Sequence, residues 1–248
     1  MLNLRIARPE TVIDLGRIPE LARISEWDAG IALGAMTRQR VTEQSELVRR
    51  RAPLVTRALA HVGHVTIRNR GTVGGSMAHA DPAAELPGAA LALDAQLVAR
   101  SSARGERTIA AADFFQGFLT TALEPDELLV EVRVPGVPER SGAAFVEIAR
   151  RHGDFAIVGA AAVVSLGGDG AIADARLVFI GVGGAPVRAT EAEALLRGKS
   201  AQAAAFAEAA EQAVTALEPT SDLHASAEYR RRVAVVLARR ALEEATPR

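Results

Sequence analysis

Short apolar runs separated by turn residues make up much of the first half of the chain. Residues 11–15 and 30–35 predict two short strands, and residues 95–99 and 128–134 predict two more. Between residues 44 and 61 the apolar positions recur at a helical spacing, which predicts one long helix. Thr37 is placed to cap a following helix, and Asp113 starts another short helical segment.

The second half has a different order, with strands first and helices afterwards. Residues 143–148, 156–165 and 171–181 predict three strands, the last two joined by a glycine-rich hairpin turn at 167–170. Three helices are expected at 190–197, 200–217 and 226–245, with Gly198 ending the first and Ser226 capping the last. This order favours an α+β fold over alternating βαβ units. The Pro-Gly-Val-Pro segment at 135–138 is the best linker between two domains.

Composition and charge narrow the classes of function. The chain has 248 residues, 49% hydrophobic and 24% charged, which is enough for one large or two modest globular domains. The net charge is −1 and neither half carries a basic excess, so nucleic-acid binding is not expected. One lysine stands against 28 arginines, so the Arg49–Arg50–Arg51 cluster is interpreted as a solvated helix face rather than a phosphate site.

Several kinds of site are excluded or left without candidates. The chain has no cysteine, so it cannot form a disulfide or hold an iron–sulfur cluster through its own thiolates. The longest apolar run, residues 156–164, is too short to cross a bilayer, and the first residues lack the apolar core of a signal peptide. We therefore expect a cytoplasmic protein without a membrane span. The residues suggest no metal-ligand cluster, acid–base pair or nucleophile–base set, so no catalytic or metal site is predicted.

Residues 62–88 are rich in glycine and proline and predict a long functional loop. Within it, Gly74 and Gly75 would allow positive φ angles and a close ligand approach. The amides of this segment, with the Thr72 and Ser76 hydroxyls on either side, would form an anion nest suited to a pyrophosphate. Glu85 could accept a hydrogen bond from a ribose hydroxyl. Taken alone, the segment is also typical of a plain turn, and it matches neither the Rossmann nor the Walker glycine pattern.

The stretch Arg-Asn-Arg-Gly-Thr-Val-Gly-Gly-Ser at 68–76, followed by His-Ala-Asp-Pro-Ala-Ala-Glu-Leu-Pro at 79–87, adds a stronger signal. It resembles the second flavin-binding motif of the FAD-binding (medium) subunits of molybdenum hydroxylases, the carbon monoxide dehydrogenase and xanthine dehydrogenase family. Residues 126–135, 149–156 and 226–230 resemble three further stretches of these subunits. The resemblance covers essentially the whole chain.

This resemblance implies a fold and a cofactor site. The fold would be a PCMH-type FAD-binding domain at residues 1–136, followed by a smaller carboxyl-terminal domain at 140–246 with a three-stranded antiparallel sheet and helices. FAD would be bound non-covalently. For His79 and Asp81, a hydrogen-bonded loop histidine and a cap of the Asp-Pro turn remain open as alternatives. The implied cofactor-binding residues are Gly71, Thr72, Gly74, Gly75, Ser76, Ala78, His79, Asp81, Glu85, Leu129 and Asp154.

The resemblance also implies partners. A large subunit would carry the molybdenum cofactor and a small subunit 2Fe-2S clusters, and electrons would pass from the clusters through FAD to an external acceptor. Members of the family have an earlier Gly-Gly-Ser-type loop, just before the stretch that resembles the start of this chain. We therefore expect an amino-terminal lobe to be missing. Two alternatives follow: a docking or vestigial subunit that does not retain FAD, and, less well supported, a free-standing flavin oxidase.

Overall fold

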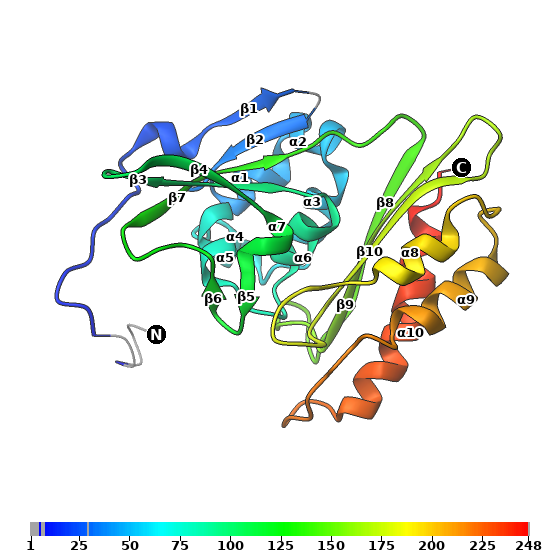
Figure 1. The fold of residues 1–248 in the computed structure, drawn as a ribbon. Coiled ribbons are helices and arrows are strands. Elements are labelled where there is room, and N and C mark those ends of the chain that lie inside the picture. The colour runs from blue at the N-terminus through cyan, green and yellow to red at the C-terminus, as the bar shows by residue number, and fades with distance from the viewer. Residues whose placement is uncertain (1–4, 6–7, 29, 248) are drawn as a thin grey trace.

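The computed structural model describes residues 5, 8–28 and 30–247, which form two large antiparallel sheets and one two-stranded sheet, with helices packed against them (Figure 1). The first sheet has the order β1 (Ile24–Trp27), β2 (Gly30–Gly34), β7 (Glu127–Val134), β3 (Gln96–Ser101) and β4 (Gly105–Ala110). The insertion of β7 between β2 and β3 joins segments a hundred residues apart in sequence. The strands predicted at 30–35, 95–99 and 128–134 are confirmed.

The strand predicted at 11–15 is wrong. No strand is present there; the partner of β2 is β1, further along the chain. Val12 and Ile13 are 68% and 78% exposed, so their apolar side chains find no core to pack against. Strand propensity reflects packing on a half-buried surface, and this segment lacks such a surface.

Short helices cover one side of the first sheet (Figure 1). Two predictions about them are wrong. The helix expected at 44–61 is divided, because Ala52 has φ −140° and Pro53 disfavours helical backbone at the residue before it. Thr37 does not cap a helix; it is buried and its hydroxyl donates to the carbonyl of Arg23. The elements are a 3₁₀ turn (Pro19–Ala22), α1 (Gln39–Gln44), α2 (Glu46–Arg51), α3 (Pro53–Leu59), α4 (Val65–Arg68), α5 (Val73–His79), α6 (Glu85–Ala92), α7 (Ala111–Phe114) and a small hairpin of β5 (Phe115–Gly117) and β6 (Thr120–Thr121).

The prediction that residues 62–88 form a long loop is also wrong, because the segment folds into α4, α5 and the start of α6. Gly74 and Gly75 lie in α5 and neither has a positive φ. The Thr72 side chain caps this helix by accepting a hydrogen bond from the Gly75 amide. The cap overrides the low helix propensity of the two glycines.

The second sheet has the order β11 (Val187–Arg188), β10 (Ile172–Ile180), β9 (Val158–Leu166) and β8 (Ser141–Ile148). Its long strands agree with the prediction, and the short β11 makes four strands where three were expected. Helices α8 (Thr190–Leu196), α9 (Ala203–Ala213) and α10 (Ala227–Ala245) follow as predicted, with Ser226 capping α10. Arg49, Arg50 and Arg51 are exposed at the end of α2, as predicted.

Both faces of the second sheet are buried. We call the first sheet with α1–α7 the first domain, and the second sheet with α8–α10 the second. Along β9, Ala161 and Val163 pack into the core of the first domain, whereas Ala160, Ala162 and Val164 face the core under α8–α10. Helices α3 and α6 contact the first face, and α8 and α10 the other (Figure 1). The sheet is therefore shared between the two layers of the molecule.

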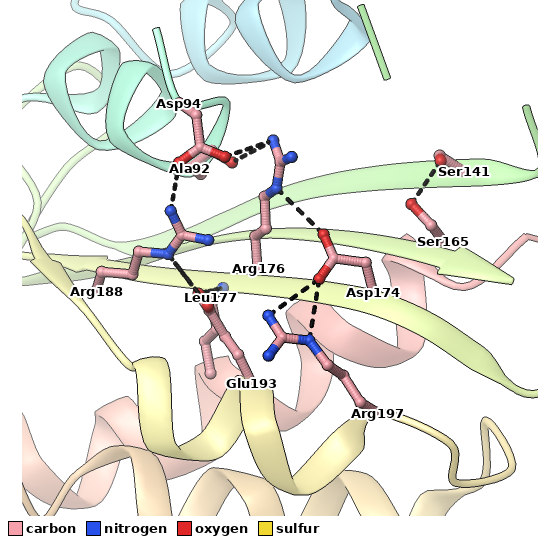
Figure 2. Close-up of polar contacts among 10 residues, drawn as sticks. All are labelled: Ala92, Asp94, Ser141, Ser165, Asp174, Arg176, Leu177, Arg188, Glu193 and Arg197. Carbon is pink, nitrogen blue, oxygen red and sulfur yellow. Dashed lines mark hydrogen bonds and ion pairs between the residues drawn. The ribbon is translucent and has the colours of Figure 1, made fainter. Parts of the chain in front are cut away.

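Charged side chains join the same two parts at the end of α6 (Figure 2). Asp94, in the turn after α6, binds the guanidinium groups of Arg176 on β10, at 3.1 Å, and of Arg188 on β11. Glu193, 2% exposed, accepts hydrogen bonds from Arg188 Nε and from the Leu177 amide, each at 2.9 Å. The network fixes β10 and β11 against the first domain. In the described residues, no helix has the length and apolar character that crossing a membrane requires.

Candidate functional site

Helix α5 lies close against the end of β2, and Gly74 permits this approach. A Cβ atom at Gly74 would stand 2.4 Å from the Cβ of Ala35 and 2.7 Å from its carbonyl oxygen. Gly74 itself is buried. The residue is therefore needed for packing between helix and strand, and it is not on the surface that a ligand could touch.

The amides at the start of α5 are all occupied by partners in the chain. Val73 and Gly74 donate to the carbonyls of Thr37 and Ala35, at 2.9 and 2.8 Å. Gly75 donates to Thr72 Oγ1 at 3.0 Å, and Ser76 to the Thr72 carbonyl at 3.2 Å. The predicted anion nest of free amides is therefore not formed, because the segment is helical and capped.

The outer face of α5 carries only small side chains, except for that of its last residue, His79. Gly75, Ala78 and His79 are exposed there, and Thr72 and Ser76 are half-buried beside them. Each of the two hydroxyl oxygens already accepts one hydrogen bond in the chain, so its hydrogen is left to donate to a ligand. This surface, which we call the α5 face, presents hydroxyl donors next to accessible backbone.

Gln39 supports the α5 face from below and was missed by the sequence reasoning. Its side chain is 3% exposed, and its amide nitrogen donates to Ser76 Oγ at 2.9 Å. Its oxygen Oε1 is buried without a hydrogen-bond partner among the described residues. A Cβ atom at Gly71 would lie 2.5 Å from this oxygen, so Gly71 makes room for Gln39. No sequence pattern links residue 39 to the glycine motif.

Beyond α5, a cavity of about 870 Å³ opens between the two domains. Asp81 and Phe118 line it from the first domain, and Asp154 and Phe155 from the loop between β8 and β9. Phe118 and Phe155 are 65% and 56% exposed, which is unusual for such large apolar rings. Phe155 directly follows Asp154 in residues 149–156, one of the stretches that resemble the family. Its place in this stretch is the sequence signal that could have identified it as a cavity residue.

Arg230, on α10, holds the wall of this cavity. It is 7% exposed and donates to the carbonyl of Gly181 at 2.9 Å and to that of Ile157. Its other terminal nitrogen binds Asp222 in the connection between α9 and α10, at 2.6 Å. One buried guanidinium thereby fixes two strand ends and one loop around the cavity.

The structure separates the predicted residues into two groups. Thr72, Gly75, Ser76, Ala78 and His79 share the α5 face, while Asp81 and Asp154 line the cavity. Asp81 Oδ1 also accepts from the Ala83 amide at 2.9 Å, so it caps the Asp-Pro turn while lining the cavity.

Glu85 and Leu129 lie elsewhere. Leu129 is 7% exposed and belongs to the core of the first domain. Glu85 is 4% exposed at the start of α6, and burial raises its pKa to about 7, with the charge of Glu147 adding to the effect. The structure turns neither side chain to the α5 face. Across the described residues, no three His, Cys, Asp or Glu side chains are arranged to hold a metal ion.

Comparison with protein families matches both parts of the chain. Residues 1–137 match the FAD binding domain in molybdopterin dehydrogenase. Residues 143–245 match the CO dehydrogenase flavoprotein C-terminal domain.

Individual relatives agree over the whole chain. The 6-hydroxypseudooxynicotine dehydrogenase complex subunit alpha of Paenarthrobacter nicotinovorans is 43% identical, over 100% of this chain and 83% of the relative. The carbon monoxide dehydrogenase medium chain of Hydrogenophaga pseudoflava is 35% identical, over 100% and 86%.

Solved structures show the same fold. Carbon monoxide dehydrogenase from Hydrogenophaga pseudoflava superposes with a TM-score of 0.94 at 38% identity, covering 98% of this chain and 84% of that one. Quinoline 2-oxidoreductase from Pseudomonas putida 86 gives 0.93 at 38% identity, covering 99% and 85%. The chain therefore belongs to the family of FAD-binding medium subunits of molybdenum hydroxylases.

Proposed function

We propose that this chain binds FAD non-covalently along the α5 face and in the adjoining cavity, and that it passes electrons from a partner's iron–sulfur clusters to an external acceptor. The observation that carries the proposal is the short chain segment that joins two surfaces. The α5 face, with its two hydroxyl donors, ends at His79, and Asp81, two residues later, lines a cavity with two exposed phenylalanine rings.

The residues present fit the parts of FAD. The Thr72 and Ser76 hydroxyls can donate to phosphate oxygens, and Gly75 and Ala78 leave room for the chain of the cofactor to lie against the helix. Phe118 and Phe155 offer aromatic surfaces for a planar ring in the cavity. The cavity volume is in the range that small-molecule sites have.

FAD, when bound, supplies the redox chemistry, which the side chains of this protein cannot perform themselves. The chain's own task is to bind and orient the cofactor. Arg230 and Asp222 keep the cavity wall in place, and the two phenylalanine rings exclude water from part of its surface.

We further propose two kinds of partner. A large subunit would carry the molybdenum cofactor, and a small subunit would carry 2Fe-2S clusters held by its own cysteines. Two observations support this division. This chain has no cysteine with which to hold such a cluster, and relatives of similar length are named as medium chains or as subunits of dehydrogenase complexes.

The site is tested by Ala78→Arg, matched with Ala204→Arg on the exposed part of α9. A long side chain at residue 78 would occupy the α5 face, while arginine keeps a good helix propensity at both positions. We expect Ala78→Arg to weaken FAD binding at least about tenfold, which is about 1.4 kcal/mol. Ala204→Arg should bind FAD as the parent chain does.

Affinity would be measured by quenching of flavin fluorescence on titration, with circular dichroism as the check of folding. Equal affinity of Ala78→Arg and the parent would show that FAD does not lie on the α5 face. A parent chain that binds no FAD would favour a docking subunit without cofactor.

A further inference from the structure

Three ionisable side chains that interact electrostatically lie where the two domains meet, two of them buried and one half-buried. Glu85 begins α6, His61 follows α3, and Glu147 lies on β8, which contacts α3 (Figure 1). Glu85 is 4% exposed, the Glu147 side chain 7% and the His61 side chain 32%. His61 Nδ1 stands 3.4 Å from Glu147 Oε1. We call these three residues the junction cluster.

In the junction cluster, one carboxylate oxygen has no hydrogen-bond donor among the described residues. Glu147 Oε2 is buried and has no hydrogen-bond partner among the described residues. A buried carboxylate oxygen without a partner is costly. With both carboxylates ionised, a single imidazolium would leave one uncompensated negative charge, whereas one bound proton makes the cluster neutral.

The electrostatics around the cluster favour retaining that proton. Burial, together with the charge of Glu147, raises the pKa of Glu85 to about 7. The hydrogen bond to Glu147 raises the pKa of His61.

The surrounding elements supply little positive charge to the carboxylates. Asp81 adds a negative field at Glu85. Arg57, on α3, is exposed, and Arg176 and Arg188 are engaged by Asp94 at the opposite end of α6. Among the described residues, the ion pair within the cluster is that between His61 and Glu147.

The cluster connects two environments. His61 is partly exposed, so protons can enter from solvent on that side. On the other side, Glu85 directly follows the turn of residues 81–84, and Asp81 in this turn lines the interdomain cavity. A proton held on Glu85 therefore lies four residues along the chain from a residue that lines the candidate cofactor cavity, and His61 gives the cluster access to solvent.

We propose that the Glu85 carboxyl holds one exchangeable proton, refilled from water through His61, and that this proton serves the interdomain cavity when negative charge arrives there. In that step the O–H bond of the Glu85 carboxyl breaks, the proton passes to the group in the cavity that has received the negative charge, and a carboxylate remains on Glu85. A proton from water then enters through the His61 imidazole and restores the carboxyl group. The role in the cavity rests on the proposed function, in which the arriving electrons come from the partner's clusters; the proton site itself does not.

The proton site is tested on the full chain without FAD, by infrared titration between pH 5 and 9, a range of about two pH units on each side of a pKa near 7. A protonated-carboxyl band should persist at pH 6 and disappear with a midpoint near 7. Glu85→Gln should remove the band, and Glu147→Gln should move the midpoint to lower pH because it removes a neighbouring charge. Glu244→Gln, on the exposed face of α10, should change nothing. A spectrum without such a band, or a band that survives both junction substitutions, would overturn the proposal.

The link to the cavity has a separate readout. In FAD-loaded chain, reduction of the flavin should take up fewer protons near pH 7 in Glu85→Gln than in the parent, as measured with a pH-indicator dye in weak buffer. Equal uptake would refute the link while leaving the infrared result intact. A chain that binds no FAD would refute the proposed function, and with it the role in the cavity, but not the proton site.

Discussion

Gly74 shows how one residue type can serve a purpose that its motif does not reveal. A pair of glycines predicts positive φ and a ligand, but the structure gives Gly74 a helical backbone and places it against Ala35. The sequence pattern is the same whether Gly74 serves a ligand or serves packing. The position of the end of β2, forty residues earlier in the chain, shows that it serves packing. By contrast, the exposed Gly75, Ala78 and His79 lie on one face because of their spacing in the motif, which sequence alone contains.

We predict that Gly74→Ala lowers the free energy of unfolding by about 1–2 kcal/mol. Overpacking costs about 1–3 kcal/mol, and a Cβ atom 2.4 Å from that of Ala35 puts the cost in the upper part of this range, about 2–3 kcal/mol. This exceeds the gain of about 1 kcal/mol in helix propensity. Gly168→Ala is the control, because a Cβ atom there meets nothing within 4 Å. Urea unfolding of both variants measures the difference. A Gly74→Ala protein as stable as the parent would mean that α5 can move away from β2 at no cost.

Glu85 makes stability depend on pH in a direction opposite to ordinary acid denaturation. Its pKa is raised from 4.5 to about 7, so the unfolded chain releases this proton at lower pH than the folded chain. Stability is therefore lost as the pH rises from about 4.5 to about 7. His61, whose pKa is also raised, contributes stability below its unfolded pKa that is lost as the pH rises through its folded pKa, so both groups act in the same direction.

Glu85→Gln should remove most of this dependence. At pH 8 the variant should be more stable than the parent by up to about 3 kcal/mol, because each pKa unit corresponds to about 1.4 kcal/mol. At pH 5 the two proteins should be nearly equal. The measurement is urea unfolding at both pH values, with Glu244→Gln as the exposed control. If the difference between variant and parent is the same at pH 5 and pH 8, Glu85 is ionised in the folded protein.

At the scale of elements, the sequence was informative where an element is long and capped. Helix α10, with Ser226 at its start, and the strands β8–β10 with their hairpin turn carry enough residues for a pattern to be read. The helices α4 and α5 have four and seven residues, too few for a helical period to show. They are held by tertiary contacts and, for α5, by the Thr72 cap, so the sequence suggested a loop.

Sequence likewise predicts one part of the candidate site and misses another. Its motif residues are contiguous in sequence, and their resemblance to a family located the α5 face. Phe118, Gln39 and Arg230 come from a hairpin, a short helix and the last helix, and they meet the motif only in the folded chain. No local sequence pattern predicts that residues so far apart in the chain lie close together. Of the two exposed rings, only Phe155 lies within a matching stretch.

At the scale of the whole molecule, two kinds of interaction join the domains, and their magnitudes differ. The second sheet is buried on both faces, with Phe145, Val163 and Ile180 in the core of the first domain. The ion pairs of Asp94 lie at the edge, where the Asp94 side chain is 46% exposed. Apolar burial of large side chains contributes about 1.5–3 kcal/mol each, whereas exposed ion pairs contribute about 1 kcal/mol or less.

We therefore predict a contrast between Asp94→Asn and Glu193→Ala. Asparagine keeps the shape of residue 94 and tolerates its φ of +50°, and Arg188 keeps Glu193 as a partner, so the loss should be below about 1 kcal/mol. Removing the buried Glu193 carboxylate leaves the Leu177 amide and Arg188 Nε without their acceptor and should cost about 3–5 kcal/mol.

Both variants should still unfold in a single transition, because the second sheet contributes side chains to both cores. Calorimetry together with urea unfolding measures both quantities. Two separate transitions in Asp94→Asn would show that the edge ion pairs, and not the shared sheet, hold the domains together.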